Sequence, residues 1–458
     1  MNVALRANRM HGVLGYPIAA GRMIVIVLAA GACAVALRSH AQASPSPNPV
    51  EHGVQQATAP SNPFVIRHAR IFDGRQVISA DSVFVQNGKI EAVGKNLSVP
   101  AGTAEIDATG DTVLPGLIDS HTHDWGNSPK QALLFGVTTE LNMAGIPAVV
   151  NKLKEAGTTD LDSADMLSAG NVVTPPKGHG TEFGVPVPTL SSAAEAQQFV
   201  GDRIAEGSDY IKIIYEDGHV CHITFTRLSK EELATAVAAA HKRGKLAIVH
   251  ISSQDDARDA IAAGADGLAH LFADSLPQPD FAEVVHRHHA FVETTLTAIQ
   301  SSLGTPSGAS LIADKRLAEY LSPDAQSHLK EHMPFVCTGK LENAFAAAKQ
   351  LHAAGVPILA GTDAPAPGSW NGASIHGELE LLVRAGFTPS DALAAATSVP
   401  ASVFHLNDRG RIAPSLRADL LLVRGDPTKD ITATRDIVAV WKLGVRDDRP
   451  THETGLDK

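Results

Sequence analysis

Short apolar runs alternate with helical patterns through the middle of the chain. Runs such as Leu246–His250 and Val356–Ala360 are too short for helices and are typical of buried parallel strands. Ser229–Glu232 is a capping box, which predicts a helix that ends at Gly244, directly before the first of these runs. A second predicted helix covers Gln254–Ala263. The alternation extends from about residue 114 to about residue 405 and predicts strands joined by crossover helices.

The segments on either side of this alternation, before residue 114 and after residue 405, are predicted to contain short strands instead. The predicted strands are Phe64–Phe72, Ser82–Gln86 and Lys89–Val93 near the start, and Ala418–Val423 and Ile437–Trp441 near the end. Turn residues such as Asn87-Gly88 separate them. We predict one small β-sandwich made from residues 63–113 and 406–458, the last of which form a tail. The alternative is two unrelated β extensions.

Six polar residues lie inside or just after the central apolar runs. They are His121, His123, Lys212, His250, His270 and Asp363. Functional side chains at the carboxyl ends of successive strands are the pattern of a (β/α)8 barrel. The predicted fold class is therefore α/β, with a TIM barrel over residues 114–405 beside the small β-sandwich. The long stretch between Thr297 and Ala347 predicts a helical insertion over the barrel mouth, a candidate lid.

The first residues have the features of an export signal. Arg22 precedes the apolar segment Met23–Leu37, and Ala41-Gln-Ala43 offers small residues for cleavage. We predict a signal peptide over residues 1–43, a proline-rich linker over 44–62, and export to the periplasm or medium without stable membrane insertion. The alternatives are lipidation at Cys33 and a retained anchor.

Composition narrows the range of partners. The formal charge of −11 argues against nucleic acid and against an anionic membrane surface as partners. With 44% hydrophobic and 19% charged residues the chain is an ordinary globular protein. We expect a small-molecule substrate and a homo-oligomer. For Cys221 and Cys337 two core thiols are favoured over a disulfide, which the sequence leaves open.

The six polar residues can form the ligand set of a two-metal hydrolase. His121 and His123 are two residues apart, so both imidazoles project from the same face of a strand and can hold one ion. Lys212 lies within an apolar run, where burial lowers the pKa of an amine. The neutral amine can add carbon dioxide, and the resulting carbamate can bridge two cations. The alternative for Lys212 is a salt bridge to a buried carboxylate.

These motifs resemble those of the amidohydrolase superfamily. The carriers are Pro115–His123, Ile211-Lys-Ile213, Ala247–His250, Gly264–His270 and Gly361-Thr-Asp-Ala364. The most similar branch contains the imidazolonepropionase-like and metal-dependent prolidase-type enzymes. The resemblance runs from Phe64 to Asp447 and is specific for the superfamily, but not for a substrate.

The resemblance also implies how the ligands are shared. His121, His123, carboxylated Lys212 and Asp363 would hold the more buried metal, and Lys212, His250 and His270 would hold the second. His179 matches the family's substrate-facing histidine. Leu228 stands where prolidase-type members often have a tyrosine, which puts simple dipeptidase specificity in doubt. Tyr215 follows the Lys212 strand, so we expect it at the mouth as a substrate contact.

The predicted reaction is hydrolysis of an amide or peptide C–N bond, as in an N-acyl amino acid or a dipeptide. A hydroxide that bridges two divalent ions would attack, and Asp363 would accept its proton and deliver it to the departing amine. Zinc suits these ligands, and manganese, cobalt or nickel would also bind. The alternatives are a two-metal hydrolase of a carbamate, ester, lactone or phosphotriester, a mononuclear deaminase, and a non-catalytic binding protein.

Overall fold

The computed structural model describes residues 62–449. The predicted signal peptide and nearly all of the predicted linker lie outside this range, as do the last nine residues. Within residues 62–449, no helix combines the length and the apolar character needed to cross a membrane.

Eight short parallel strands form the centre of the described chain. The first three form one sheet, and the other five form a second sheet in sequence order. Their bounds are β7 (Leu117–Thr122), β8 (Val137–Asn142), β9 (Asp165–Ser168), β10 (Ile211–Ile214), β11 (Ala247–His250), β12 (Gly267–Ala269), β13 (Phe291–Glu293) and β14 (Ile358–Leu359). Isolated parallel bridges, Val173 with Ile213 and Thr122 with Ala364, connect the two sheets at both ends. The fold is thus α/β, while a single closed barrel sheet stays a prediction.

Helices follow most of these strands and cover them. They are α1 (Ser128–Leu134), α2 (Pro147–Thr159), α3 (Ala196–Ala205), α4 (Lys230–His241), α5 (Gln254–Ala262), α6 (Phe281–Arg287), α11 (Leu341–Ala353), α12 (Ile375–Arg384), α13 (Pro389–Ala395) and α14 (Ser398–Val403). The predicted capping box is present at Ser229, whose side chain accepts from the backbone of Glu232. One large core joins the outer faces of the strands to these helices.

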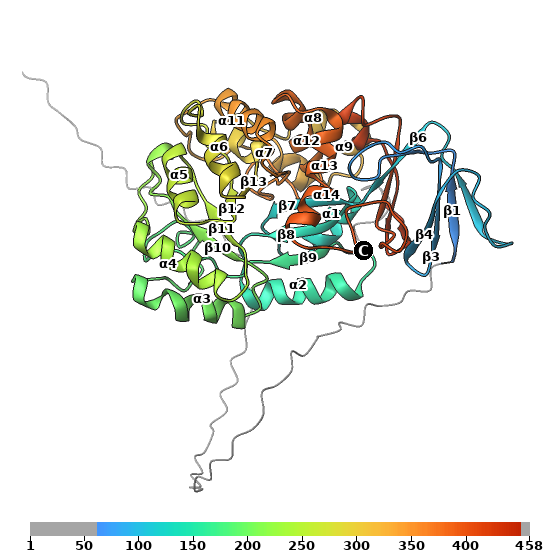
Figure 1. The fold of residues 1–458 in the computed structure, drawn as a ribbon. Coiled ribbons are helices and arrows are strands. Elements are labelled where there is room, and N and C mark those ends of the chain that lie inside the picture. Colours follow the sequence, from blue (N-terminus) through green and yellow to red (C-terminus); the bar gives the residue numbers. More distant parts are fainter. Residues whose placement is uncertain (1–61, 450–458) are drawn as a thin grey trace, which may run out of the picture. The chain divides into compact units, whose positions relative to one another are not determined.

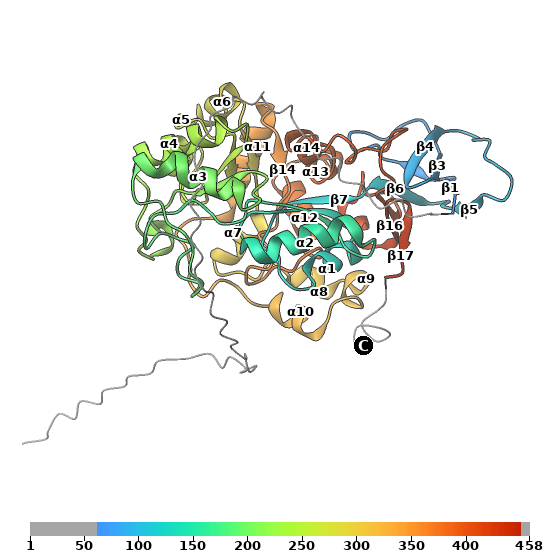
Figure 2. The ribbon, with the colours of Figure 1, turned by 90° about the horizontal axis from the view of Figure 1, so that it is seen from below.

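The strand-rich ends of the described chain form two further sheets. One has the order β4 (Lys89–Gly94), β3 (Ser82–Gln86), β1 (Phe64–Arg67), β5 (Ala104–Asp107). The other has the order β17 (Val445–Asp447), β16 (Ile437–Lys442), β15 (Leu420–Arg424), β6 (Asp111–Pro115), β2 (Arg70–Ile71). A common core that includes Ile66, Val85, Leu422 and Trp441 lies between them. Figures 1 and 2 show these strands on the side opposite α3, α4 and α5. A separate β-sandwich domain with the predicted boundaries stays a prediction.

Left-handed residues end two strands, one of them shorter than the apolar pattern suggested. Phe64–Phe72 is divided into β1 and β2, which belong to different sheets. His68 lies between them with φ 60°, a left-handed conformation that a continuous strand cannot include. In the same way β13 ends at Glu293, and a helix begins at Leu296 after Thr295, whose φ is 44°.

The predicted insertion is helical, as expected. It contains α7 (Leu296–Ser302), α8 (Ala309–Ala313), α9 (Lys315–Ala318) and α10 (Pro323–His328) before the chain reaches α11.

One cysteine prediction is wrong. Cys221 and Cys337 form a disulfide rather than two free core thiols. Their segments also exchange a backbone bond, from the Thr338 N–H to the Val220 carbonyl at 2.7 Å. The 116-residue separation hides this proximity from any local pattern. The disulfide thus attaches the insertion to the segment that follows β10.

Candidate metal centre

His121 and His123 mark the end of β7. His121 is fully buried, and the imidazole of His123 is 33% exposed. The Nε2 atoms of the two rings lie 3.3 and 2.9 Å from the same carboxylate oxygen, Oδ1 of Asp363. Two residues from one strand and one from the segment after β14 therefore meet at a single point.

Backbone geometry at Asp363 explains how it reaches this point. Gly361 passes so close to β7 that an added Cβ would lie 2.7 Å from the Cβ of His121. Asp363 itself has φ 58°, and its N–H donates to the His121 carbonyl at 2.8 Å. Such left-handed conformations of larger residues carry strain and are concentrated at functional sites. Although burial opposes it, the contacts with both histidines lower the pKa of the Asp363 carboxyl well below its usual value.

His250 and His270 come from neighbouring strands. His250 ends β11, and His270 follows β12 with φ 74°. The His270 ring centroid lies 4.5 Å from that of His250 and 4.6 Å from that of His121. Nitrogen and oxygen atoms of His121, His270 and Asp363 all lie within 4.8 Å of one another. Burial lowers the pKa of both His250 and His270, which favours neutral rings with a free lone pair.

Lys212 on β10 is also in this group. Its side chain is buried, and within residues 62–449 its Nζ has one hydrogen-bonding contact, 3.3 Å from Nε2 of His121. Burial lowers the pKa of this amine to about 8, although Glu293 and Asp363 oppose the shift. The amine is therefore neutral in part near physiological pH.

Glu293 is a residue that the sequence analysis missed. It ends β13, is fully buried, and its Oε2 lies 3.0 Å from Nδ1 of His121. Among the described residues, its Oε1 has no hydrogen-bond partner. Burial raises its pKa well above the usual value, while Lys212 opposes this. An acidic residue at the end of an apolar run is the same signal that identified Lys212.

Three of the histidines share an orientation. In each, Nδ1 is occupied by a group away from the centre: Glu293 for His121, the Ala144 carbonyl at 3.3 Å for His123, and Oγ1 of Thr295 at 2.7 Å for His270. Nε2 of each ring is therefore the nitrogen that could serve as a ligand atom. Metal-binding histidines are usually held in this way by a second partner.

A second group lies beside the first. The imidazole of His179 has its centroid 5.1 Å from that of His250, and ligand atoms of His179, Glu216 and His250 lie within 4.8 Å of one another. Glu216 was not assigned a role from the sequence. It lies four residues after Lys212, so a period of two places both side chains on the same face. Burial opposes it, but His250 and His179 lower the pKa of Glu216 to about 2.

Tyr215 is not part of either group. Its side chain belongs to the core outside the strands, and its hydroxyl donates to Oδ2 of Asp259 on α5 at 3.0 Å. The same period of two places it opposite Lys212 and Glu216. Glu216 therefore faces the site where Tyr215 was expected. Leu228 is buried in the same outer core.

Other histidines have structural surroundings. His376 is buried, with Nδ1 near Oγ1 of Thr434 and Nε2 near the Phe135 carbonyl, both at 3.0 Å. The three histidines of residues 286–289 are exposed at the end of α6 and lie on a solvated surface.

Comparison with known proteins decides the family. The family model described as "Amidohydrolase family" matches residues 112–446. The chain belongs to the amidohydrolase family. It is a hydrolase of amide C–N bonds, and its family acts on small-molecule substrates and generally binds divalent metals.

Individual relatives agree with this assignment. Imidazolonepropionase of Deinococcus deserti is 26% identical over 86% of this chain and 98% of its own length. Ochratoxinase of Aspergillus niger is 24% identical over 72% of this chain and 75% of its own. A crystal structure of a candidate prolidase from Bifidobacterium longum has a TM-score of 0.69 and 26% identity, and the match covers 86% of this chain and 96% of that one. The amidohydrolase thus falls in the imidazolonepropionase-like branch.

Proposed function

We propose that this protein is a two-metal amidohydrolase that cleaves N-acyl amino acids or dipeptide-like amides. The observation that carries the proposal is the convergence of four histidines, a lysine and an aspartate from five strands, β7, β10, β11, β12 and β14. Three of the imidazoles present Nε2 to the centre, with Nδ1 held from outside.

The residues present fit a divalent pair. Neutral imidazoles and a carboxylate of lowered pKa are the donors that zinc, manganese, cobalt or nickel accept, and zinc suits them best. His121, His123, Lys212 and Asp363 would hold the more buried ion, and Lys212, His250 and His270 the other. When bound, such a pair would acidify water and polarise the scissile carbonyl.

Lys212 would act as N6-carboxylysine. Its amine is buried and has a pKa of about 8, so the neutral form needed to attack carbon dioxide is available. The attack forms a C–N bond and releases one proton, which leaves a carbamate anion with two oxygens. Among the described residues the amine contacts only Nε2 of His121, so its reaction with carbon dioxide would disturb a single hydrogen-bonding contact.

Asp363 would move the proton. It would accept a proton from the attacking water and deliver it to the nitrogen of the departing amine, which leaves poorly as an anion. Its side chain is 15% exposed, so it borders the space that a substrate enters. His179 would contact the substrate beside His250.

Hydrolysis assays with the metal-reconstituted protein test the proposal. N-acyl amino acids, dipeptides, carbamates, aryl esters and lactones would be compared, with the metal-depleted protein as the control. We expect metal-dependent release of amine from the amides at the highest kcat/KM. A higher kcat/KM for carbamates, esters or lactones would favour the second candidate class, since both classes use the same ligands.

We further propose that β7 to β14 close into a (β/α)8 barrel over residues 114–405 and that the sheets of the two ends form the sandwich of residues 63–113 and 406–449. The bridge of Thr122 with Ala364 supports the closure.

Export is also a proposal, and the Cys221–Cys337 disulfide supports it, because disulfides persist in oxidising compartments. A homo-oligomer is a further proposal, to be tested by light scattering. An N-terminus near Ser44 in protein recovered from a bacterial envelope would support export.

A further inference from the structure

Several large apolar side chains are exposed in the connections between the parallel strands. Eight large apolar residues in residues 62–449 are at least 38% exposed, and all but Val77 lie in segments that follow the carboxyl ends of the parallel strands. They are Trp125 after β7, Ile146 and Val149 after β8, Phe183 and Val185 after β9, Leu276 after β12, and Val336 in the insertion after β13. Two of these strands also carry candidate ligands, His121 and His123 at β7 and His270 after β12.

Phe183 has the most direct connection to the site. Its side chain is 71% exposed, and its ring centroid lies 6.0 Å from that of His179. Phe225, from the segment between β10 and α4, lies 5.1 Å from the same imidazole. His179 in turn lies 5.1 Å from the candidate ligand His250. Two aromatic rings from different loops therefore border one imidazole next to the metal centre.

Hydrogen bonds hold the chain next to both of these rings. Nδ1 of His179 lies 2.6 Å from Oε1 of Glu182, and the other oxygen of Glu182 accepts from the Gly180 N–H at 2.6 Å. The N–H of Phe225 donates to the Asp217 carbonyl at 2.9 Å. The residue before Phe183 and the segment of Phe225 are thus both fixed near the centre.

We propose that Phe183 and Phe225 form an apolar subsite that selects amides with an aryl group next to the scissile bond. This inference rests on the proposed function. An aryl group seated there would cover a ring that is otherwise mostly in water, which stabilises the complex by removing apolar area from solvent. The occupant is substrate rather than a second copy of the chain, because both rings lie next to His179, whose imidazole is beside the candidate ligand His250.

A matched substrate series tests this subsite. N-acetyl-alanine has no aryl group, N-benzoyl-alanine has one on the acyl side, and N-acetyl-phenylalanine has one on the amine side. Changes in apolar contact of this kind typically alter kcat/KM by about 10- to 100-fold. We expect at least one aryl amide to exceed N-acetyl-alanine by about tenfold or more. Phe183→Ala and Phe225→Ala should each reduce this ratio.

Leu276→Ala is the matched control, since Leu276 is 66% exposed in the segment after β12 and has no aromatic ring to pack on His179. It should leave the aryl-to-methyl ratio as in the unaltered protein. A ratio near one in the unaltered protein, or an unchanged ratio in Phe183→Ala, would overturn the subsite. So would a change of oligomeric state in Phe183→Ala with no change in selectivity, because the ring would then serve an interface.

Absence of turnover for every amide would reject the proposed function, and thermal shift would still test the subsite. N-benzoyl-alanine and N-acetyl-phenylalanine would be compared with N-acetyl-alanine as ligands of the metal-loaded protein. At least one aryl ligand should raise Tm more than N-acetyl-alanine does, and Phe183→Ala should remove that difference. Equal shifts from all three ligands would contradict the subsite.

Discussion

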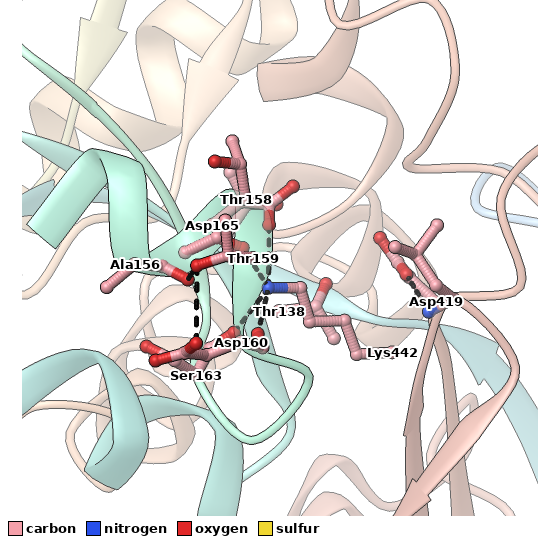
Figure 3. A network of polar contacts seen from close by, with 12 residues as sticks. Thr138, Ala156, Thr158, Thr159, Asp160, Ser163, Asp165, Asp419 and Lys442 are labelled. Carbon is pink, nitrogen blue, oxygen red and sulfur yellow. Dashed lines mark hydrogen bonds and ion pairs between the residues drawn. The ribbon is translucent and has the colours of Figure 1, made fainter. Parts of the chain in front are cut away.

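Two buried lysines in this protein have opposite surroundings. Lys442 on β16 is 1% exposed, and its ammonium donates to the carbonyls of Gly157, Asp160 and Ser163 and pairs with Oδ1 of Asp165 at 2.8 Å. Figure 3 shows Asp160, Ser163 and Asp165 around the Nζ of Lys442. Lys212 is equally buried at 2% exposed, but has the one contact to His121 within residues 62–449.

The difference separates a structural lysine from a chemical one. A buried ammonium is costly unless its three N–H groups and its charge are satisfied, and Lys442 meets both conditions. Lys212 does not, and the same burial lowers its pKa to about 8. Burial therefore disfavours a charged ammonium at Lys212 and favours a neutral amine or a carbamate. Substituting each lysine in turn should separate the two roles.

The largest expected effect is loss of activity in Lys212→Met. Residues that act as one catalytic unit typically cost about 10⁴-fold or more when removed, and we expect a loss of that size in kcat/KM. The unfolding free energy of the metal-free variant should stay equal or rise, because a buried amine with a single contact is costly to fold and methionine removes that cost. Elemental analysis should also show loss of the second metal equivalent. Full stoichiometry and turnover would contradict the carbamate.

Asp363→Asn tests proton transfer in the same site that contains Lys212. Asparagine keeps a ligand oxygen but cannot accept a proton, so metal content should survive better than turnover. Loss of a general base typically lowers the rate by about 10²- to 10⁴-fold. Metal content and kcat would be measured together against the unaltered protein. Near-normal kcat with both ions bound would assign the proton to another group, such as His179.

The lysine pair also shows how far local sequence reaches. Lys212 could be identified because it interrupts the apolar Ile211–Ile214 run and has family motifs around it. Lys442 stands in an equally apolar run, but its partners come from residues 157–165, and no local pattern joins these segments. The sequence therefore indicated that Lys212 is buried, but it could not indicate that Lys442 has hydrogen-bond partners and Lys212 largely lacks them.

The same limit explains the other successes and failures. The strand ends that carry His121, His250 and Asp363 follow from local periodicity, and the structure brings them together. Glu216 and Glu293 carried the same local signal and could have been found. The Cys221–Cys337 disulfide and the division of Phe64–Phe72 between two sheets depend on contacts across the chain or on a single left-handed residue, which periodicity does not report.

Lys442→Met should affect stability and leave the chemistry intact. Removing one partner from a buried, hydrogen-bonded ion pair typically costs about 3–5 kcal/mol, and here three carbonyls also lose their donor. We expect the unfolding free energy in urea to fall by that amount, while kcat of the folded fraction and metal content are retained. An unchanged urea midpoint would show that the Lys442 contacts contribute little, and the contrast with Lys212 would then fail.

The smallest expected effect is on the pH dependence of the unfolding free energy, to which Asp165 contributes. Arg409 and Arg417 contact its Oδ2 at 2.5 Å each, and Lys442 contacts Oδ1. Burial opposes it, but these three cations, with Arg417 the strongest, lower the pKa of Asp165 below its usual value. A carboxyl with a lowered folded pKa contributes stability above its unfolded pKa of about 3.9, and this is lost as pH falls towards the folded value.

One such group changes the unfolding free energy by at most about 1.4 kcal/mol per pH unit. Urea unfolding of the metal-free protein at pH 7, 4 and 3 should therefore show a decrease below pH 4. Lys442→Met removes one of the three cations, which raises the folded pKa of Asp165 towards the unfolded value and should flatten this decrease. Lys212→Met lies outside the Asp165 network and should keep the slope of the unaltered protein. If both variants keep that slope, Lys442 is not coupled to Asp165, and the satisfied lysine owes its stability to the three carbonyls alone.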